Sequence, residues 1–268
     1  MKKFSDIKIW IRGAGELGSA TAHLLHRIGF SVFLSELENP LAIRRPVTFS
    51  DAIFNGFSEV EGARAKFCSI SKIEKVFSAD EIPILIDNSD LMKNACFEIY
   101  IDARMLKTIQ NDSRNIANIS IGLGPGFTAK NNCDVVIETM RGHNLGKVIW
   151  DGSAQSNTGI PGNIGGKTKD RIIKSPANGT VDWLVDFGEI VQKYQALGKV
   201  GNTEILTKIH GIVRGLIYPK VAILDGMKIG DVDPRGTSVN FRAISEKSRC
   251  IARGVLEAIL INLKGENG

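Results

Sequence analysis

Six residues near the N-terminus, Gly13–Gly18, have the types and spacing of a phosphate-binding loop. They read GAGELG, a GxGxxG motif between a short apolar run at 7–12 and a stretch of helical spacing. In such a loop the first glycine permits a tight turn, the second admits a pyrophosphate to the backbone, and the third allows close helix packing. Free N–H groups and the helix dipole favour an anion. We therefore expect a phosphate contact from Gly13, Ala14, Gly15, Glu16, Leu17 and Gly18, with a purely connecting turn as the alternative.

Two further candidates follow this loop. Glu36 ends the next apolar run, eighteen residues beyond Gly18, where a carboxylate accepts hydrogen bonds from ribose hydroxyls. Arg44 and Arg45 follow in the next loop, where guanidinium groups bind phosphate in bidentate fashion. A solvated surface pair is an equally good interpretation of the two arginines.

A second glycine cluster, Gly122-Leu123-Gly124-Pro125-Gly126, directly follows the apolar run at 119–121. Open α/β sheets bind ligands at the carboxyl ends of their strands, so we expect Gly122, Gly124 and Gly126 to face the first loop across a crevice. A structural turn that needs positive φ angles accounts for these glycines equally well.

An acid, a guanidinium and an imidazole then occur within six residues, at Glu138, Arg141 and His143. Such a group binds a substrate or a protein client, or performs acid–base chemistry. The alternative is an ion pair between Glu138 and Arg141 that braces a loop.

The elements that must position these residues are strands and helices in alternation. The apolar run at 7–12, the helical spacing from Leu17 to Ile28 and the run Ser31–Ser35 predict a strand, a helix and a parallel strand, with Gly29 ending the helix. Further apolar runs predict an open, mostly parallel sheet; they lie at 63–70, 82–87, 97–102, 119–121 and 135–139. The predicted fold is therefore α/β, with a Rossmann-like domain over residues 1–150.

The remaining chain differs in composition and in its pattern of apolar residues. Residues 151–166 are rich in Gly, Ser and Asn and are predicted to be a linker. Short β-like runs over 167–236, with two Gly-x-Val turns 32 residues apart, resemble the barrel-sandwich domains that carry biotin or lipoate. The hairpin at 199–204 lacks their modified lysine motif, so we expect no swinging arm. Apolar spacing predicts one helix within 237–268.

Composition narrows the function classes. The 268 residues, 43% of them hydrophobic, have a formal net charge of +5 but no Lys/Arg run, which argues against a nucleic-acid partner. No apolar stretch is long enough for a membrane span, and no secretory leader opens the sequence, so we expect a cytoplasmic protein. Four scattered cysteines without a CxxC pair predict neither disulfides nor a metal site. Nothing indicates the oligomeric state.

Three phrases carry a family resemblance: IRGAGELGSATAHLLHRIGFSVFLSE, ENPLAIRRPVTFSDAIFNG and GLGPGFTAKNNCDVVIETMRGHNLGKVIWDGSAQSNTG. Together they resemble the YqeB-type accessory proteins of selenium-dependent molybdenum hydroxylase systems, and the combination of GPGF with IETxRGHxLG is far more specific than GxGxxG. A more distant resemblance is to the Rossmann domain of XdhC-type factors.

The resemblance implies an accessory or maturation role for a molybdenum hydroxylase client. The ligand would be nucleotide-like, either a molybdopterin dinucleotide or NAD(P). No catalytic residue comes with the resemblance, and the sequence does not decide whether the protein is an enzyme. The alternative is an NAD(P)-dependent oxidoreductase in which His143 acts as acid or base, and a scaffold with an empty loop is a third hypothesis.

Overall fold

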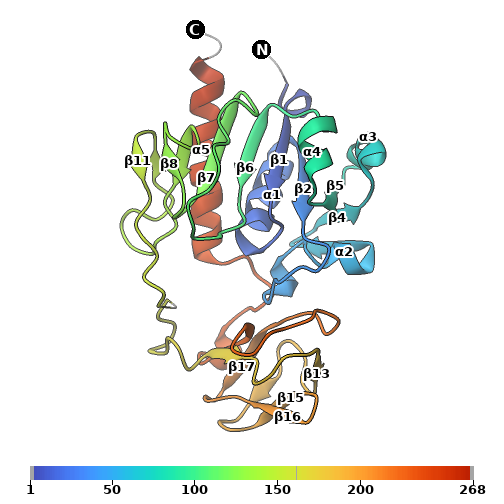
Figure 1. The fold of residues 1–268 in the computed structure, drawn as a ribbon, viewed down its shortest axis with the longest axis vertical. Coiled ribbons are helices and arrows are strands. Elements are labelled where there is room, and N and C mark those ends of the chain that lie inside the picture. The colour runs from blue at the N-terminus through green and yellow to red at the C-terminus, as the bar shows by residue number, and fades with distance from the viewer. Residues whose placement is uncertain (1–2, 161, 266–268) are drawn as a thin grey trace. The chain divides into compact units, whose positions relative to one another are not determined.

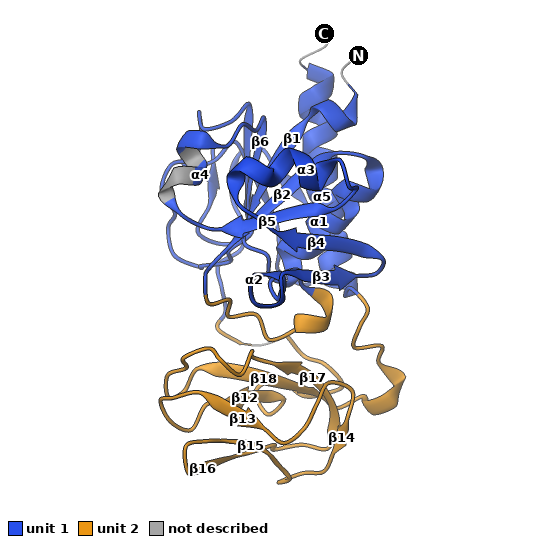
Figure 2. Ribbon diagram, turned by 90° about the vertical axis from the view of Figure 1, so that its right-hand side faces the viewer, with its two compact units in different colours: residues 1–38, 48–158, 244–268 blue, residues 39–47, 159–243 orange. Residues whose placement is uncertain are grey.

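The computed structural model describes residues 3–160 and 162–265, which form two compact units (Figure 2). The first unit comprises Met1–Glu38, Thr48–Thr158 and Ile244–Gly268, and the second comprises Asn39–Val47 and Gly159–Ala243. Each unit is therefore built from separate stretches of chain, whereas the domains expected from the sequence are contiguous. Residues 1–2, 161 and 266–268 belong to the predicted first domain, linker and C-terminal helix, and they lie outside the described residues.

A nine-stranded sheet forms the centre of the first unit, in the order β10-β9-β7-β6-β1-β2-β5-β4-β3 (Figure 1). Neighbouring strands from β9 to β4 pair in parallel, and only the edge strands β10 and β3 pair antiparallel. The predicted mostly parallel sheet is confirmed. Its strands are β1 (Lys8–Arg12), β2 (Ser31–Glu36), β3 (Phe57–Val60), β4 (Ala63–Phe67), β5 (Ile82–Ile86), β6 (Ile99–Asp102), β7 (Ile119–Leu123), β9 (Val135–Ile137) and β10 (Val148–Ile149).

Helices α1 (Glu16–Ile28) and α5 (Glu246–Gly265) cover one face of this sheet (Figure 1). Successive side chains of β1 point to opposite faces of the sheet, so Ile9 and Ile11 both point toward these helices. There they share one apolar core with α5. Trp10 points to the opposite face, where its indole N–H donates to Ser35 Oγ at 2.9 Å. Among the described residues, that face carries two short helices, α3 (Ile73–Phe77) and α4 (Ser89–Asn94). The remaining elements of the unit are α2 (Ala52–Asn55), η1 (Phe4–Asp6), η3 (Ile70–Lys72), β8 (Thr128–Ala129) and β11 (Gly152–Ser153).

Two boundaries differ from the sequence prediction. The C-terminal helix begins at Glu246, not near residue 237, because Ser245 caps it: Ser245 Oγ accepts the N–H of Ser248 at 3.2 Å. Apolar spacing extended the prediction across Phe241, which precedes this cap. Within the predicted linker, Gly152–Ser153 pairs with β8 and so belongs to the first unit.

Two antiparallel sheets form the second unit, in the orders β12-β18-β17-β14 and β13-β15-β16. The predicted hairpin is confirmed, since Lys199 pairs with Glu204 across a tight turn at Gly201-Asn202. Arg171 and Arg214 both bond to the buried Asp231. The elements are η2 (Arg45–Val47), β12 (Ile172–Lys174), β13 (Val181–Trp183), β14 (Ile190–Val191), β15 (Ala196–Val200), β16 (Thr203–Leu206), β17 (Gly211–Leu216), β18 (Lys228–Asp233) and η4 (Gly236–Ser238).

Candidate functional site

The first glycine loop joins β1 to α1, and two of its glycines are fixed by close contacts. Gly13 has φ +99° and donates its N–H to Ser35 O at 2.8 Å. A Cβ at Gly13 would lie 3.0 Å from the Arg104 nitrogen, and a Cβ at Gly18 would lie 1.9 Å from Gly13 O. Only glycine fits these two positions, because the turn and the helix approach each other through their backbones.

Gly15 differs from both neighbours in the motif. A Cβ built at Gly15 meets no atom within 4 Å, so the space above its backbone is open. Gly15 is also the N-cap of α1, with extended backbone at φ −69° and ψ −171°, and no side chain caps the helix there. The first turn of a helix leaves backbone N–H groups without intrahelical partners, and these groups attract anions. Gly15 is therefore the position where a phosphate has room beside a helix N-terminus.

Glu36 lies at the end of β2 and contacts this loop directly. Its Oε2 accepts the N–H of Ala14 at 2.8 Å, and its Oε1 accepts the N–H of Leu37 at 2.8 Å. Burial raises the pKa of Glu36 above its ordinary value, while these two N–H groups act in the opposite direction. The carboxylate is thus held beside the loop, at the edge where a ribose would lie if phosphate bound at Gly15.

The loop lies at the point in the sheet where the order of successive strands reverses. Strands follow the order β1, β2, β5 on one side of β1 and β6, β7, β9 on the other. Ala103 and Arg104, just after β6, contact Gly13 just after β1. Arg104 is held there by Asp102, whose carboxylate accepts the Arg104 Nε–H at 3.0 Å. In open α/β sheets this switch point at the carboxyl edge is where ligands bind.

The second glycine cluster is filled by protein atoms. A Cβ at Gly122 would lie 2.2 Å from Phe127, one at Gly124 would lie 2.4 Å from Thr139 Oγ1, and one at Gly126 would lie 2.2 Å from Thr108 O. Gly124 and Gly126 also have positive φ angles. The packing of this loop against its own neighbours accounts for all three glycines, as the structural-turn alternative expected.

Glu138, Arg141 and His143 follow β9, but they do not gather into one group. Glu138 is 2% exposed, and its carboxylate oxygens accept the N–H groups of Met140 and Gln155, each at 2.7 Å. Arg141 pairs with Glu246 of α5, not with Glu138. His143 is exposed, and its ring makes no hydrogen bond to any described residue. Glu138 therefore braces the loop through the backbone.

Lys247 is a site residue that sequence reasoning missed. It lies in the first turn of α5 and is half-buried, and burial together with the charge of Arg141 lowers its pKa. The opposing charges are those of Glu16 and Glu138. The neighbouring Ser248 donates to Glu16 Oε1 at 3.2 Å, which joins the first turns of α1 and α5. Lys247 thus brings a cation to the end of α1 where phosphate is expected.

Arg44 and Arg45 belong to the second unit, unlike the glycine loop that they were expected to serve. Both are half-buried, so they are not a fully solvated pair. The Arg45 guanidinium lies over two aromatic rings of the same unit, 4.7 Å from the centroid of Tyr218 and 5.3 Å from that of Phe187. Arg45 therefore packs within the second unit. The expectation that it serves the glycine loop rested on its position in the sequence alone.

Other chemistry is limited in the described part of the chain. Residues 3–160 and 162–265 contain no group of three or more His, Cys, Asp or Glu side chains placed to hold a metal ion. The four cysteines are free thiols, and burial raises the pKa of Cys133 to about 12. Within the same residues, none of the helices combines the length and the apolar character needed to cross a bilayer.

Comparison with known proteins gives one close similarity in sequence. The chain is 41% identical over 256 residues to "Uncharacterized protein YqeB" of Escherichia coli (strain K12). The alignment covers 94% of this chain and 47% of that protein, so the chain spans about half the length of its curated relative. No protein-family model matches the chain.

Similarities to solved structures are low. A succinylglutamate desuccinylase/aspartoacylase from Rhodobacter sphaeroides is 21% identical with a TM-score of 0.21, covering 24% of this chain and 21% of that one. The E. coli tRNA N6-threonylcarbamoyladenosine dehydratase TcdA in complex with ATP is 12% identical with a TM-score of 0.29, covering 97% and 89%. These values support no argument about fold or function, whereas the sequence similarity is consistent with a YqeB-type protein.

Proposed function

We propose that the first unit is a Rossmann-type nucleotide-binding domain. Phosphate binds at Gly15 and the N-terminus of α1, Lys247 supplies a cation beside it, and Glu36 accepts the hydroxyls of a ribose. The observation that carries this proposal is the contrast within one motif: Gly13 and Gly18 are closed by backbone contacts, whereas Gly15 faces open space. Neither a close contact nor a positive φ angle requires glycine at position 15, so the connecting turn alone does not account for this residue.

Within the cell, this domain serves an accessory or maturation role for a molybdenum hydroxylase, including the selenium-dependent class. The nucleotide is then a molybdopterin dinucleotide or NAD(P), and the client enzyme is the partner that receives or uses it. The resemblance of three sequence phrases to YqeB-type accessory proteins supports this role, and the likeness to XdhC-type factors extends it. The exposed loop with Arg141 and His143 is the proposed client contact.

The second unit, in the same proposal, is a flattened barrel-sandwich of two antiparallel sheets. Its hairpin tip, Gly201-Asn202, has no lysine to carry a biotin or lipoate group, so the unit acts without a swinging arm. The oxidoreductase alternative, in which His143 acts as acid or base, has no such support, because the His143 ring is exposed and makes no hydrogen bond to a described residue.

Calorimetric titration tests the nucleotide proposal directly. The purified protein is titrated with NAD, NADP, ATP, CTP and molybdopterin dinucleotide, and the same titrations are repeated with Gly15→Asp. A Cβ at Gly15 meets no atom within 4 Å, and the negative charge of an aspartate there would repel a phosphate. We expect saturable binding of one nucleotide, which Gly15→Asp abolishes.

Asn131→Asp is the matched control, because it adds the same charge on the exposed turn between β8 and β9. It is expected to retain full affinity. Binding that survives Gly15→Asp, or the absence of binding by every nucleotide of the panel, would contradict the proposal. The accessory role is tested separately by the molybdenum cofactor content of a co-expressed hydroxylase, which should fall with Gly15→Asp and stay unchanged with Asn131→Asp.

A further inference from the structure

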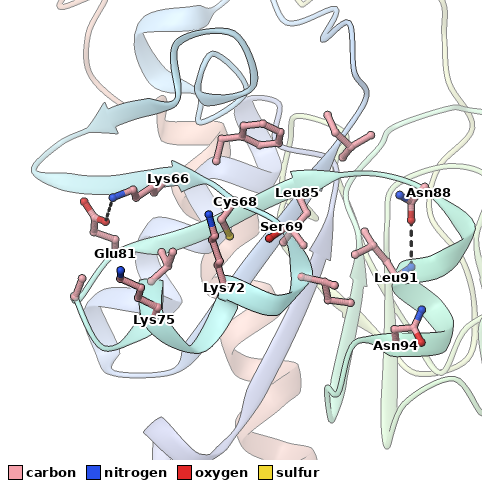
Figure 3. Close-up of a pocket in the computed structure, with 15 residues that line it drawn as sticks. Lys66, Cys68, Ser69, Lys72, Lys75, Glu81, Leu85, Asn88, Leu91 and Asn94 are labelled. Carbon is pink, nitrogen blue, oxygen red and sulfur yellow. Dashed lines mark hydrogen bonds and ion pairs between the residues drawn. The ribbon is translucent and has the colours of Figure 1, made fainter.

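A cavity of about 810 Å³ lies on the sheet face of the first unit that carries Trp10 (Figure 3). It is bordered by β4, β5, α3 and α4. Parallel sheets are normally covered on both faces, and the helices on this face are short: α3 has five residues and α4 has six. The volume is in the range of small-molecule sites.

The lining combines an apolar surface with amides. Ile70 and Ile86 line the cavity with half-buried apolar side chains, and Val76, Leu85 and Leu91, which also line it, are each 5% exposed or less. Asn88 and Asn94 flank them from the α4 side, and Asn88 Oδ1 accepts the Leu91 N–H at 3.3 Å (Figure 3). The cavity therefore has an apolar body with polar groups at its margin, the usual composition of a ligand pocket.

Three lysines give the cavity a positive charge. Lys66, Lys72 and Lys75 gather at the end formed by β4 and α3 (Figure 3). The carboxylate in the lining, Glu81, lies 3.1 Å from Arg64 and 3.9 Å from Lys66, so it is already shared between two cations. Lys72 and Lys75 are exposed and form no ion pair with any described residue. Positive charge is thus in excess beside an apolar surface.

We propose that this cavity is a binding site for a small anionic amphiphile. Its head group lies against the ammonium groups of Lys72 and Lys75, and its apolar body covers Ile70 and Ile86. None of the residues of the glycine loop lines the cavity, and neither does Glu36. The site is therefore separate from the proposed nucleotide site and goes beyond the function proposed for it.

The probe for this site is 1-anilinonaphthalene-8-sulfonate, an anionic amphiphile that fluoresces in apolar surroundings. The double variant Lys72→Glu/Lys75→Glu reverses two charges that support no other described ion pair, so the fold should persist. We expect its dissociation constant for the dye to rise about tenfold or more. Lys208→Glu/Lys220→Glu makes the same charge change on exposed positions of the second unit and should leave the constant unchanged.

Competition shows whether both parts of the ligand matter. Decanoate should displace the dye from the full-length protein, whereas decan-1-ol and inorganic phosphate at the same concentration should not. Equal displacement by decan-1-ol would overturn the anionic part of the proposal, and equal displacement by phosphate would overturn the apolar part.

Alkylation locates the bound ligand. Cys68 lines the cavity and is 9% exposed, whereas Cys96 of the same unit is exposed and does not line it. Decanoate should slow the reaction of Cys68 with N-ethylmaleimide, measured by peptide mass spectrometry, and leave the rate at Cys96 unchanged. An unchanged rate at Cys68, or equal loss of dye binding in both double variants, would overturn the proposal.

Discussion

Two glycine clusters of the first unit differ in what lies above their backbones. In Gly13–Gly18, the middle glycine of the motif faces open space, while the outer two are closed by backbone contacts. In the cluster at 122–126, each of the three glycines faces a protein atom at 2.4 Å or less from the position of a Cβ. A glycine pattern therefore marks a place where other atoms can approach the backbone closely, and the surroundings decide whether those atoms belong to a ligand or to the protein itself.

Among the variants that test this comparison, Gly126→Ala should have the largest effect on the free energy of unfolding. Its Cβ would meet Thr108 O at 2.2 Å, and alanine at φ +101° is strained. Overlap and strain together should lower the free energy of unfolding by about 3 kcal/mol or more, measured by urea denaturation. Gly152→Ala is the matched control, because φ is +95° there but no atom lies within 4 Å, so only about 1 kcal/mol should be lost. Equal losses in the two variants would show that packing does not explain the second cluster.

Lys247→Gln tests whether a cation from α5 contributes to nucleotide binding at the open loop. Removing the cation beside the N-terminus of α1 should weaken nucleotide binding about tenfold, because hydrogen bonds to charged groups contribute roughly 1.5–3 kcal/mol. Calorimetric titration measures the change, and Lys264→Gln in the last turn of the same helix is the control. If both variants bind as tightly as the wild type, Lys247 has no part in the site.

Acidification should weaken nucleotide binding severalfold through Glu36. Burial raises the pKa of Glu36, so its carboxylate becomes protonated at a higher pH than an ordinary glutamate. A protonated carboxyl accepts fewer hydrogen bonds from ribose, and affinity for NAD should fall as the pH decreases through this raised pKa. Glu36→Gln should bind more weakly and show no such dependence. Identical pH profiles for the two proteins would contradict the role of Glu36.

Gly15→Asp should have the smallest effect on the free energy of unfolding, and with the opposite sign to Gly126→Ala. Aspartate is a favoured N-cap and the backbone of Gly15 is already extended, so the ligand-free protein should gain up to about 1 kcal/mol. Thermal unfolding without ligand measures this gain. A loss of stability would mean that Gly15 is closed by packing, as the second cluster is.

Local patterns predicted much of the first unit. The run at 7–12, the helical spacing to Ile28 and the run at 31–35 correspond to β1, α1 and β2, because apolar periodicity records which side chains face the core. The turn at Gly29 also follows the prediction, with φ +102°. The later runs at 82–87 and 97–102 contain β5 and β6.

Long-range placement could not be predicted in the same way. Ser248, the neighbour of Lys247, contacts Glu16 across more than two hundred residues, and no local pattern records that contact. Arg45 follows β2 in the sequence, yet it belongs to the second unit, where it packs against Tyr218 of the same unit. Sequence patterns therefore pointed to the glycine loop and to Glu36, which contacts it, whereas Lys247 as a candidate required the structure.

The separate stretches of the first unit have a consequence for the order of folding during synthesis. Ile251, Val255 and Ile259 of α5 belong to the same apolar core as β1 and α1, but they are translated only after residues 159–243. A nascent chain that ends at Ala243 holds the whole second unit and lacks the helix that covers this core. Synthesis therefore completes the second unit before α5, and the apolar core shared by β1, α1 and α5 can close only once α5 has been translated.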